Sequence, residues 1–233
     1  MDLKDKIVLI TGSTDGLGKR LAFALSQNGA KVIIHGRDKK KVDEVVKEVR
    51  AIKGVVCDFN DIKTISDSFS TIDKLDILVN NAGAWLEGNT IEAPVEKIIE
   101  LANTNLASHL LVTRTLLPIL QKAEFGQILN TISVAGIEIP AGYFHTIYSA
   151  TKFGMQGFSE AMAKEFDNKN LRVMGFYPGG METKLFRKAG NDYKEHEPWM
   201  FDTKESVEAI IFMLTRNPKV NIKRLDLINH LQE

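Results

Sequence analysis

The sequence has a single cysteine, no surplus of charge of either sign and no long hydrophobic run. Cys57 is the only cysteine in the 233 residues, so an intramolecular disulfide bond is excluded. Lysine plus arginine and aspartate plus glutamate each number 30, which gives a formal net charge of zero. A chain without a basic surplus is not expected to bind nucleic acid or an anionic membrane surface.

The N-terminal stretch MDLKDKIVLITG has an apolar run that is too short for a signal-peptide core or a membrane span. Together with the lone cysteine, which agrees with a reducing compartment, this predicts a cytoplasmic protein with no membrane segment.

Short apolar segments rich in β-formers alternate along the chain with longer segments of helical periodicity. We expect one domain spanning residues 1–233, because neither a linker nor a repeat divides the chain. The expected strands are Lys6–Thr11, Lys31–His35, Gly54–Cys57, Leu75–Asn80, Gly126–Ile132, Leu171–Tyr177 and Arg224–Ile228. The expected helices are Gly16–Asn28, Lys39–Arg50, Ile62–Ile72, Val95–Gln121, Thr146–Asn168 and Lys204–Thr215.

Several of these strands, such as IVLI and DILVN, are apolar at consecutive positions rather than at alternate ones. This pattern is typical of parallel strands that helices cover on both faces. We therefore expect an α/β fold, a Rossmann-like doubly wound three-layer sandwich with a seven-stranded parallel sheet. The irregular stretch 179–202 is long for a connection, and we expect it to be a substrate lid.

A glycine-rich turn, TGSTDGLG from Thr11 to Gly18, separates the first strand from the first helix. Gly12 permits a tight turn, Gly16 permits close approach of the backbone to a phosphate, and Gly18 permits the helix to pack on the strand. The helix N-terminus then offers free N–H groups to a pyrophosphate. The spacing differs from GxGxxG, and the GK[ST] ending of a nucleoside-triphosphate loop is absent. A strand–helix turn without a ligand is the alternative.

The end of the second strand bears on the choice of cofactor. An acidic residue there would bind the adenosine ribose and repel a 2′-phosphate, but the sequence reads His35-Gly36-Arg37-Asp38. Gly36 leaves room, and the Arg37 guanidinium suits a phosphate. This favours NADP(H) over NAD(H). In the alternative interpretation Arg37 is a solvated loop cation and Asp38 caps the next helix.

A tyrosine and a lysine four residues apart, Tyr148 and Lys152, lie on the expected helix that begins at Thr146. They share a helix face, and the lysine cation would lower the pKa of the tyrosine and suit it to proton transfer. Ser133 follows the strand GQILNTI, at the carboxyl edge of the sheet where ligands bind, and would stabilise charge on a carbonyl oxygen. A half-buried tyrosine beside a solvated lysine is the alternative.

The order of motifs along the chain resembles the short-chain dehydrogenase/reductase family. The resemblance runs from about Lys4 to Thr183 and rests on TGSTDGLG, NNAG (Asn80–Gly83), Asn105, Ser133, YSATK and PGGMET. It implies that Tyr148 is the catalytic acid/base, that Lys152 holds the nicotinamide ribose, and that Ser133 binds the substrate carbonyl. Asn105 would position a water in a proton relay.

The resemblance also implies the residues that bind the cofactor. Asp58 would bind the adenine amino group, Asn81 to Gly83 would line the adenosine ribose, and the backbone of Met181 together with Thr183 would lie near the carboxamide. Taken singly, Asp58 could be a helix cap and Asn81 a turn former. The implied cofactor residues are Gly12, Ser13, Thr14, Gly16, Leu17, Gly18, Arg37, Asp58, Asn81, Ala82, Gly83, Tyr148, Lys152, Met181 and Thr183.

Three departures from the family pattern stand out. Met181 replaces the usual valine or isoleucine, and Asp15 stands where some NADP-preferring members carry a basic residue. The C-terminal stretch RLDLINHLQE lacks the Asp-Gly-Gly ending of many members, which puts their usual tetramer contact in doubt. In this family the counterparts of the two longest expected helices pair across a dimer interface, so a homodimer or homotetramer is expected. Burial within one subunit is the alternative.

The remaining polar and aromatic residues give weaker signals. The five histidines form no HxxxH or HExxH pattern, so no metal site is expected. His145 either touches substrate or packs, and Cys57 is expected to be a core residue. An apolar substrate pocket or simple packing of the lid would account for Trp85, Phe144, Leu185, Phe186, Trp199 and Met200.

The sequence thus predicts an NADP(H)-dependent oxidoreductase that interconverts a small-molecule carbonyl and alcohol. A 3-oxoacyl thioester or a general ketone or aldehyde would be the substrate. In reduction NADPH would deliver hydride to the carbonyl carbon while Tyr148 protonates the oxygen. The alternatives are a dehydratase or epimerase on the same scaffold and a non-catalytic NADP-binding sensor.

Overall fold

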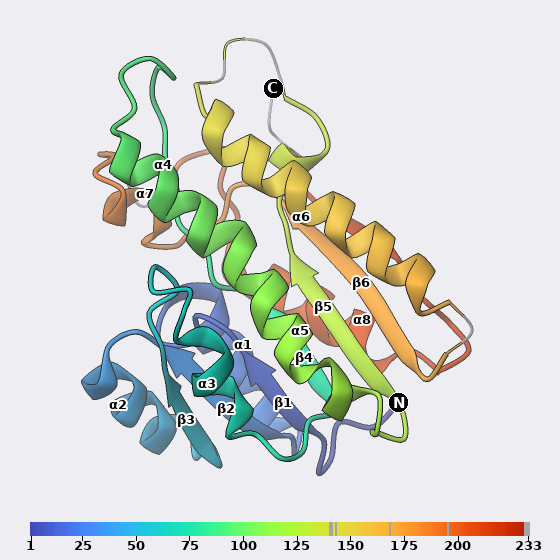
Figure 1. Ribbon diagram of the computed structural model, residues 1–233. Coiled ribbons are helices and arrows are strands. Elements are labelled where there is room, and N and C mark those ends of the chain that lie inside the picture. The colour runs from blue at the N-terminus through green and yellow to red at the C-terminus, as the bar shows by residue number, and fades with distance from the viewer. Residues whose placement is uncertain (140–141, 143, 168, 195, 231–233) are drawn as a thin grey trace.

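Seven strands form one sheet in the order β3-β2-β1-β4-β5-β6-β7 (Figure 1). Every neighbouring pair is parallel, as predicted. The computed structural model describes the whole chain except residues 140, 141, 143, 168, 195 and 231–233. The strands are β1 (Ile7–Ile10), β2 (Lys31–Gly36), β3 (Lys53–Val56), β4 (Ile77–Asn80), β5 (Gly126–Thr131), β6 (Leu171–Pro178) and β7 (Arg224–Leu227).

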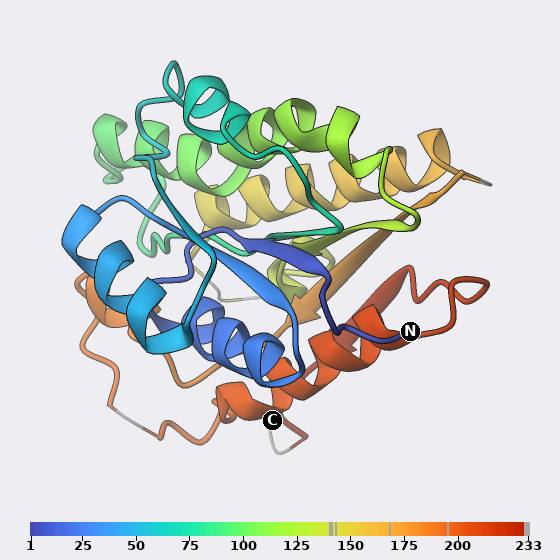
Figure 2. The same cartoon turned by 90° about the horizontal axis from the view of Figure 1, so that it is seen from below.

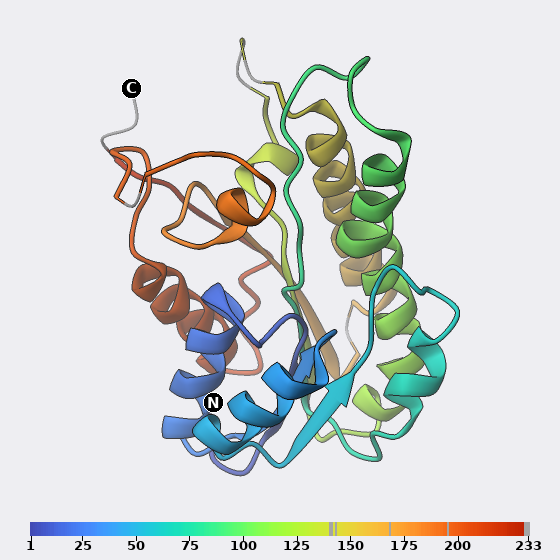
Figure 3. The ribbon, with the colours of Figure 1, turned by 90° about the vertical axis from the view of Figure 1, so that its left-hand side faces the viewer.

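Helices cover both faces of the sheet and make three layers (Figures 2 and 3). One face carries α1 (Gly16–Gln27), α2 (Lys39–Val49) and α8 (Thr203–Thr215). The other carries α3 (Ile65–Ser70), α5 (Ser108–Leu120) and α6 (Thr146–Glu165). Two further helices, α4 (Val95–Ala102) and α7 (Leu185–Lys188), contribute no residue to the two main hydrophobic cores.

Apolar residues of β1 belong to the hydrophobic cores on both faces of the sheet. Val8 and Ile10 pack under the helices of one face, and Leu9 packs under those of the other. Successive side chains of a strand point to opposite faces, so a strand covered on both sides is apolar at consecutive positions. All three side chains are fully buried, and each contributes roughly 1.5–3 kcal/mol relative to an exposed one.

Aspartates begin three of the helices. Asp15 accepts the Gly16 N–H at the start of α1, Asp38 accepts the Lys41 N–H at the start of α2, and Asp202 accepts the Lys204 N–H at the start of α8. Side-chain acceptors at this position satisfy N–H groups that have no partner within the helix. The capping role of Asp38, left open by the sequence, is therefore confirmed.

The largest difference from the sequence prediction is the helix expected over Val95–Gln121. The chain instead forms α4, a π-helical turn at Asn103–Ala107, and then α5. The segments follow one line in Figure 1, so the wider turn interrupts the hydrogen-bond pattern without redirecting the chain.

Smaller differences concern the ends of elements. The helix expected over Ile62–Ile72 is reduced to α3, and that expected over Thr146–Asn168 ends at Glu165; position 168 lies outside the described residues. Helix α7 lies within the stretch 179–202 that was expected to be irregular. Strand ends differ from the prediction by up to two residues, the largest shift being at β4. No described helix is long and apolar enough to cross a membrane.

Candidate active site

The glycine-rich turn needs glycine for reasons that the structure makes specific. Gly12 and Gly16 have φ of 63° and 54°, in the left-handed region that favours glycine. A first side-chain carbon at position 12 would lie 2.8 Å from Ala82 Cα, and one at position 18 would lie 2.5 Å from the Gly12 carbonyl oxygen. The prediction that Gly18 permits close packing of the helix is confirmed, whereas Gly16 is required first by its backbone conformation.

Two hydroxyl groups, those of Thr11 and Ser13, hold this turn. Thr11 Oγ1 accepts the N–H groups of Asn81 (2.9 Å) and Ala82 (3.0 Å), so it joins the turn to the end of β4. Ser13 Oγ donates to the Ile10 carbonyl (2.8 Å) and accepts the His35 N–H (2.9 Å). Ser13 is fully buried, and its hydroxyl serves the turn.

Two buried histidines flank Phe59 beneath the same edge of the sheet. His35 Nδ1 accepts the Gly12 N–H (3.0 Å), and its Nε2 lies 3.2 Å from the Cys57 carbonyl oxygen. The His35 ring stacks on Phe59 with centroids 4.4 Å apart. On the far side of Phe59, His109 Nε2 lies 2.8 Å from the Ala82 carbonyl oxygen.

Burial lowers the pKa of His35 to about 4 and that of His109 to about 3. Both rings are therefore neutral at physiological pH, and each carries its proton on the nitrogen that faces a backbone carbonyl. His35 thus ties the glycine turn to the end of β3, and His109 fixes the turn that follows β4. No sequence motif marks either residue, because their partners come from distant parts of the chain.

At the end of β2, the space predicted at Gly36 is already filled. A first side-chain carbon there would lie 2.6 Å from the methyl carbon of Thr14, so the glycine makes room for Thr14 rather than for a ligand. This corrects the expectation from the sequence. Arg37 is exposed and forms no ion pair with any described residue. Its exposure agrees both with a phosphate contact and with a solvated loop cation.

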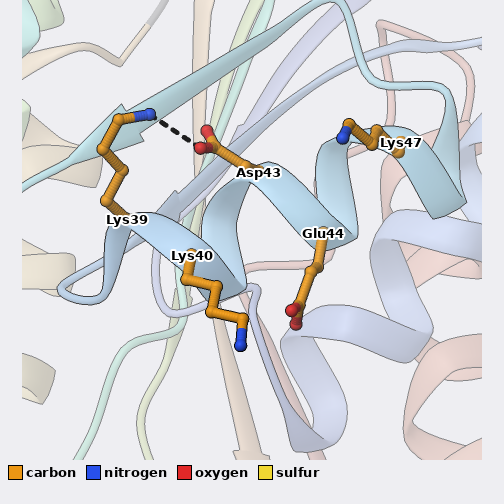
Figure 4. Close-up of a pocket in the computed structure, with 5 residues that line it drawn as sticks. All are labelled: Lys39, Lys40, Asp43, Glu44 and Lys47. Carbon is orange, nitrogen blue, oxygen red and sulfur yellow. Dashed lines mark hydrogen bonds and ion pairs between the residues drawn. The ribbon is translucent and has the colours of Figure 1, made fainter.

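The lysines that follow Arg37 point elsewhere. Lys39 forms an ion pair with Asp43 (2.7 Å) on the outer face of α2, where Lys40, Glu44 and Lys47 also lie (Figure 4). Alternating charges of this kind are typical of a solvated helix surface. The group therefore carries no part of the candidate site.

The implied adenosine residues lie at the carboxyl ends of β3 and β4. Asp58 is exposed and accepts the Asn60 N–H (3.0 Å), which makes a turn rather than a helix cap. Asn81 Nδ2 donates to the Thr11 carbonyl oxygen (2.9 Å). A side chain at Gly83 would begin 3.7 Å from Asn105 Oδ1 and 3.9 Å from Lys152 Nζ. A side chain at this position would therefore contact both groups.

The three residues predicted to carry the chemistry lie together. Tyr148 and Lys152 are 6% and 5% exposed, on the buried side of α6, and Ser133 follows β5. The Ser133 hydroxyl lies close enough to that of Tyr148 to lower the pKa of the tyrosine, and it accepts the Ala135 N–H (3.2 Å). Lys152 Nζ lies 5.6 Å from the centroid of the Tyr148 ring and 3.4 Å from the Thr131 carbonyl oxygen.

The pKa of Tyr148 differs from the expectation. Burial raises it to about 12, against the opposing effect of the Ser133 hydrogen bond. Burial also lowers the pKa of Lys152 to about 8. The sequence predicted a tyrosine pKa lowered by Lys152, but the cost of removing the phenolate from water exceeds the opposing effect of Ser133.

Asn105 lies in the π-helical turn and is fully buried. Its Oδ1 accepts the Ala84 N–H (2.7 Å), and its Nδ2 donates to the Ala84 carbonyl oxygen (3.0 Å) and to Thr151 Oγ1 (3.2 Å). The side chain therefore holds the segment after β4 against α6, beside Tyr148. The wider turn brings Asn105 to this position, and its geometry could not be read from apolar periodicity.

Residues 179–202, which we call the lid segment and of which residue 195 lies outside the described residues, follow β6 at this edge of the sheet. Met181 pairs with Phe201 in an isolated parallel bridge, and its sulfur accepts the Ser206 hydroxyl (3.0 Å). Thr183 Oγ1 accepts the Leu185 N–H (3.2 Å). These contacts hold Met181 and Thr183, the two residues that the resemblance places near the nicotinamide carboxamide.

Aromatic side chains join the lid segment to Tyr148. The Trp85 ring lies 4.4 Å from that of Tyr148 and 4.9 Å from that of Phe186, measured between centroids. Tyr193, which the sequence analysis missed, joins this group through Phe186 and Trp199. Of the other residues proposed for an apolar pocket, Leu185 is half-buried, Met200 is buried and Phe144 is largely exposed.

Ion pairs connect the outer side of the lid segment to the body of the protein. Lys188 pairs with Asp15 in the glycine turn (2.8 Å), and Arg20 of α1 pairs with Asp202 (2.7 Å). Between α1 and the lid segment lies a cavity of about 390 Å³. The carboxylate of Asp15 adjoins the N-terminus of α1, which favours negative charge.

Within the described part of the chain, no three or more histidine, cysteine, aspartate or glutamate side chains gather in a way that would hold a metal ion.

His145 bonds through Nδ1 to Ser149 Oγ (2.8 Å), and its ring lies 5.3 Å from that of Trp85. It packs beside Tyr148, at the border of the candidate site. Cys57 is a buried free thiol, as expected.

Comparisons with known proteins agree with this geometry. The family model described as short chain dehydrogenase matches residues 6–194. The NADP-dependent 3-hydroxy acid dehydrogenase of Schizosaccharomyces pombe is 31% identical, over 94% of this chain and 91% of that protein. An uncharacterized oxidoreductase of Staphylococcus aureus strain MW2 is 27% identical, over 96% of each chain.

Solved structures share the fold. A putative short chain dehydrogenase from Escherichia coli CFT073, complexed with NADPH, has a TM-score of 0.85 at 22% identity and covers 97% of this chain and 98% of its own. An actinorhodin polyketide ketoreductase with NADPH has a TM-score of 0.84 at 24% identity and covers 95% of each chain.

Proposed function

The chain belongs to the short-chain dehydrogenase family, and on this basis we propose that it is an NADP(H)-dependent oxidoreductase that interconverts a carbonyl and an alcohol. The observation that carries the proposal is the buried group of Ser133, Tyr148 and Lys152 at the carboxyl edge of the sheet, beside the glycine turn. The bound cofactor supplies or accepts the hydride.

The chain's own residues handle the proton and the charge. In reduction the Tyr148 hydroxyl donates a proton to the substrate oxygen, and the Ser133 hydroxyl hydrogen-bonds to the same oxygen as negative charge develops on it. The Lys152 cation stabilises the phenolate that remains. Asn105 is a positioning residue, because it holds Ala84 and Thr151 beside this group. Oxidation reverses the proton transfer.

The residues around the glycine turn fit a dinucleotide. Gly16 is the first residue of α1, and the space beside it is open: a side-chain carbon there would have Thr183 as its nearest neighbour, at 3.8 Å. Gly83 likewise has no side chain between solvent and Lys152. Arg37 is free to pair with a 2′-phosphate, which supports NADP(H) over NAD(H). We propose as cofactor residues Gly12, Ser13, Thr14, Gly16, Leu17, Gly18, Arg37, Asp58, Asn81, Ala82, Gly83, Tyr148, Lys152, Met181 and Thr183.

The proposal extends to the surroundings of the site. The lid segment would cover a small-molecule substrate, in a chain that acts as one domain in the cytoplasm. Apolar side chains that are exposed on α4 and α6, among them Val95, Ile99 and Phe153, support a homodimer or homotetramer.

The proposed function is tested by Tyr148→Phe. We expect NADPH-dependent turnover to be abolished while the Kd for NADPH stays within about threefold, because the ring remains and only the proton donor is lost. Tyr177→Phe is the matched control, since Tyr177 is also a buried tyrosine, on β6. Undiminished turnover in Tyr148→Phe would contradict the mechanism.

The cofactor preference is tested by Arg37→Ala. The Kd values of NADPH and NADH are measured by fluorescence titration, and we expect the preference for NADPH to fall by about tenfold as a charge-assisted pair is lost. Lys39→Ala, which removes a cation already paired with Asp43, is expected to leave the preference intact. If Arg37→Ala keeps the full preference for NADPH, Arg37 is not the selector.

A further inference from the structure

The wall of the candidate site that faces Tyr148 is apolar. Tyr148 packs in one cluster with buried Leu101 and Ala135, and with the half-buried side chains of Ala84, Trp85, Leu86 and Ile147. The Trp85 ring is 4.4 Å from that of Tyr148. A substrate whose carbonyl oxygen reaches the Tyr148 hydroxyl must therefore lay its neighbouring groups along aliphatic and aromatic surface.

The lid segment continues this surface. Phe186 meets Trp85 edge to face at 4.9 Å, and Trp199 meets Phe186 at 5.4 Å. Side chains of this kind bind apolar ligands through a large contact area and favour aromatic rings in edge-to-face contact. Trp85, the ring nearest that of Tyr148, and Phe186, which contacts Trp85, come from different segments of the chain and form one continuous aromatic surface.

The charge fixed in this wall is negative. Glu87 accepts the Tyr193 hydroxyl at 2.9 Å, Asn191 Nδ2 at 3.0 Å and Trp85 Nε1 at 3.3 Å. Three donors therefore hold a carboxylate at the edge of the Trp85 indole. A second carboxylate, brought in by a substrate, would meet like charge there.

The cations near the lid segment do not offset this charge. Lys152 is the one lysine or arginine among the described residues that contacts the Tyr148 ring, and its ammonium bonds to the Thr131 carbonyl oxygen. Lys184 and Arg187 line the cavity on the α1 side of the lid segment, and Lys188 pairs with Asp15. A substrate carboxylate beside Trp85 would thus meet the carboxylate of Glu87, and no described lysine or arginine stacks on the Trp85 ring.

On the basis of the proposed function, we propose that the substrate is a neutral ketone or aldehyde with an aryl or alkyl group that packs on Trp85 and Phe186. Glu87 makes the site discriminate against carbonyl compounds that carry a carboxylate beside the reacting carbon. In the reaction, NADPH gives a hydride to the carbonyl carbon and Tyr148 gives a proton to its oxygen, which yields the alcohol and NADP⁺. The substrate class differs from the hydroxy acid in the name of the Schizosaccharomyces pombe relative.

The inference is tested with two substrates that differ in charge, 3-oxo-3-phenylpropanoate and its ethyl ester. We measure kcat/KM for each from NADPH consumption by the full chain, and we expect the ester to be favoured by at least about tenfold. Glu87→Gln is expected to raise the ratio of kcat/KM for the acid to that for the ester several-fold.

A second variant examines the apolar wall. Trp85→Ala is expected to lower kcat/KM for the ester by at least about tenfold while the Kd for NADPH stays within about threefold, and Trp85→Phe should restore most of the loss. Phe212→Ala, which removes an exposed aromatic side chain from α8, is the matched control.

The outcomes separate this inference from the proposed function. Preference for the acid, or a ratio of acid to ester that Glu87→Gln leaves unchanged, would overturn the substrate class and leave the oxidoreductase function standing. NADPH binding without consumption of NADPH with either substrate would overturn both.

Discussion

Tyr148 and Lys152 show how one cause acts in opposite directions on two neighbouring groups. Burial disfavours the charged form of each, so the pKa of the tyrosine rises to about 12 while that of the lysine falls to about 8. The YxxxK spacing predicted that the two side chains share a helix face, and the structure confirms it. The spacing could not predict the direction of the tyrosine shift, because burial depends on the whole fold.

The Lys152 pKa predicts a pH profile for catalysis. In the reductive direction the rate should be flat near neutral pH and fall above about pH 8, where Lys152 loses the proton whose charge stabilises the Tyr148 phenolate. The measurement is kcat against pH with saturating NADPH. A rate that stays constant well above pH 8 would show that the lysine charge is not needed.

The same shift predicts that Lys152→Met stabilises the protein. The folded pKa of Lys152 lies below its unfolded value of 10.5, so the buried cation costs stability at neutral pH, and this cost is relieved as the pH rises from 8 to 10.5. Removal of the charge should raise the free energy of unfolding at pH 7 by on the order of 1–3 kcal/mol while turnover is lost. Urea unfolding measures it, with the exposed Lys164→Met on the same helix as control. A less stable Lys152→Met variant would refute this account.

At the scale of elements, the alternation of strands and helices could be predicted, and the interruption of one helix could not. Asn103–Ala107 reads NTNLA, a short and mainly polar stretch within a longer helical pattern, and apolar periodicity does not reveal that its turn is π-helical. Helix α7 is too short for periodicity to reveal. Both lie at the candidate site, where tertiary contacts such as that of Asn105 with Ala84 decide the local backbone.

The contact between α7 and the glycine turn leads to a prediction about cofactor binding. Lys188 neutralises Asp15, whose carboxylate sits at the N-terminus of α1 where we propose that the pyrophosphate binds. Lys188→Ala should weaken NADPH binding by about two- to fivefold, a modest effect because the pair is partly exposed. Fluorescence titration measures the Kd, and Asp15→Asn in the same chain should restore it. Unaltered affinity in Lys188→Ala would show that the pair has no influence on the cofactor.

At the scale of the whole molecule, the consecutive apolar residues of strands such as β1 were sufficient to predict two helix layers and a parallel sheet. The polar interior was not predictable in the same way. From their residue type alone His35 and His109 would be expected at the surface, yet both are buried. Their burial could not be predicted, because each finds its backbone partner only after β2, β4 and α5 have come together.

The lowered pKa values of His35 and His109 predict that the protein loses stability in acid. Their folded pKa values of about 4 and about 3 lie below the ordinary 6.5, so the unfolded chain binds more protons in the interval between. The free energy of unfolding should be constant above pH 6.5 and fall by several kcal/mol as the pH approaches 4. Chemical unfolding at a series of pH values measures the slope.

The contribution of His109 to this fall in the free energy of unfolding can be measured with a substitution. Gln can donate an amide N–H to the Ala82 carbonyl but does not titrate, so His109→Gln should flatten the decline. His230→Gln, at an exposed position, should leave the slope unaltered. An equally steep decline in His109→Gln would assign acid sensitivity to other groups.

The Thr14 methyl beside Gly36 restricts how this enzyme could evolve a different cofactor. An acidic side chain at position 36, which would suit the ribose of NAD(H), would collide with that methyl, 2.6 Å from its first carbon. The substitution becomes acceptable only after Thr14 has been replaced by a smaller residue. A lineage therefore has to take the two steps in a fixed order, and the first brings no gain by itself. Such epistasis between the glycine turn and the end of β2 would preserve the present preference over long evolutionary times.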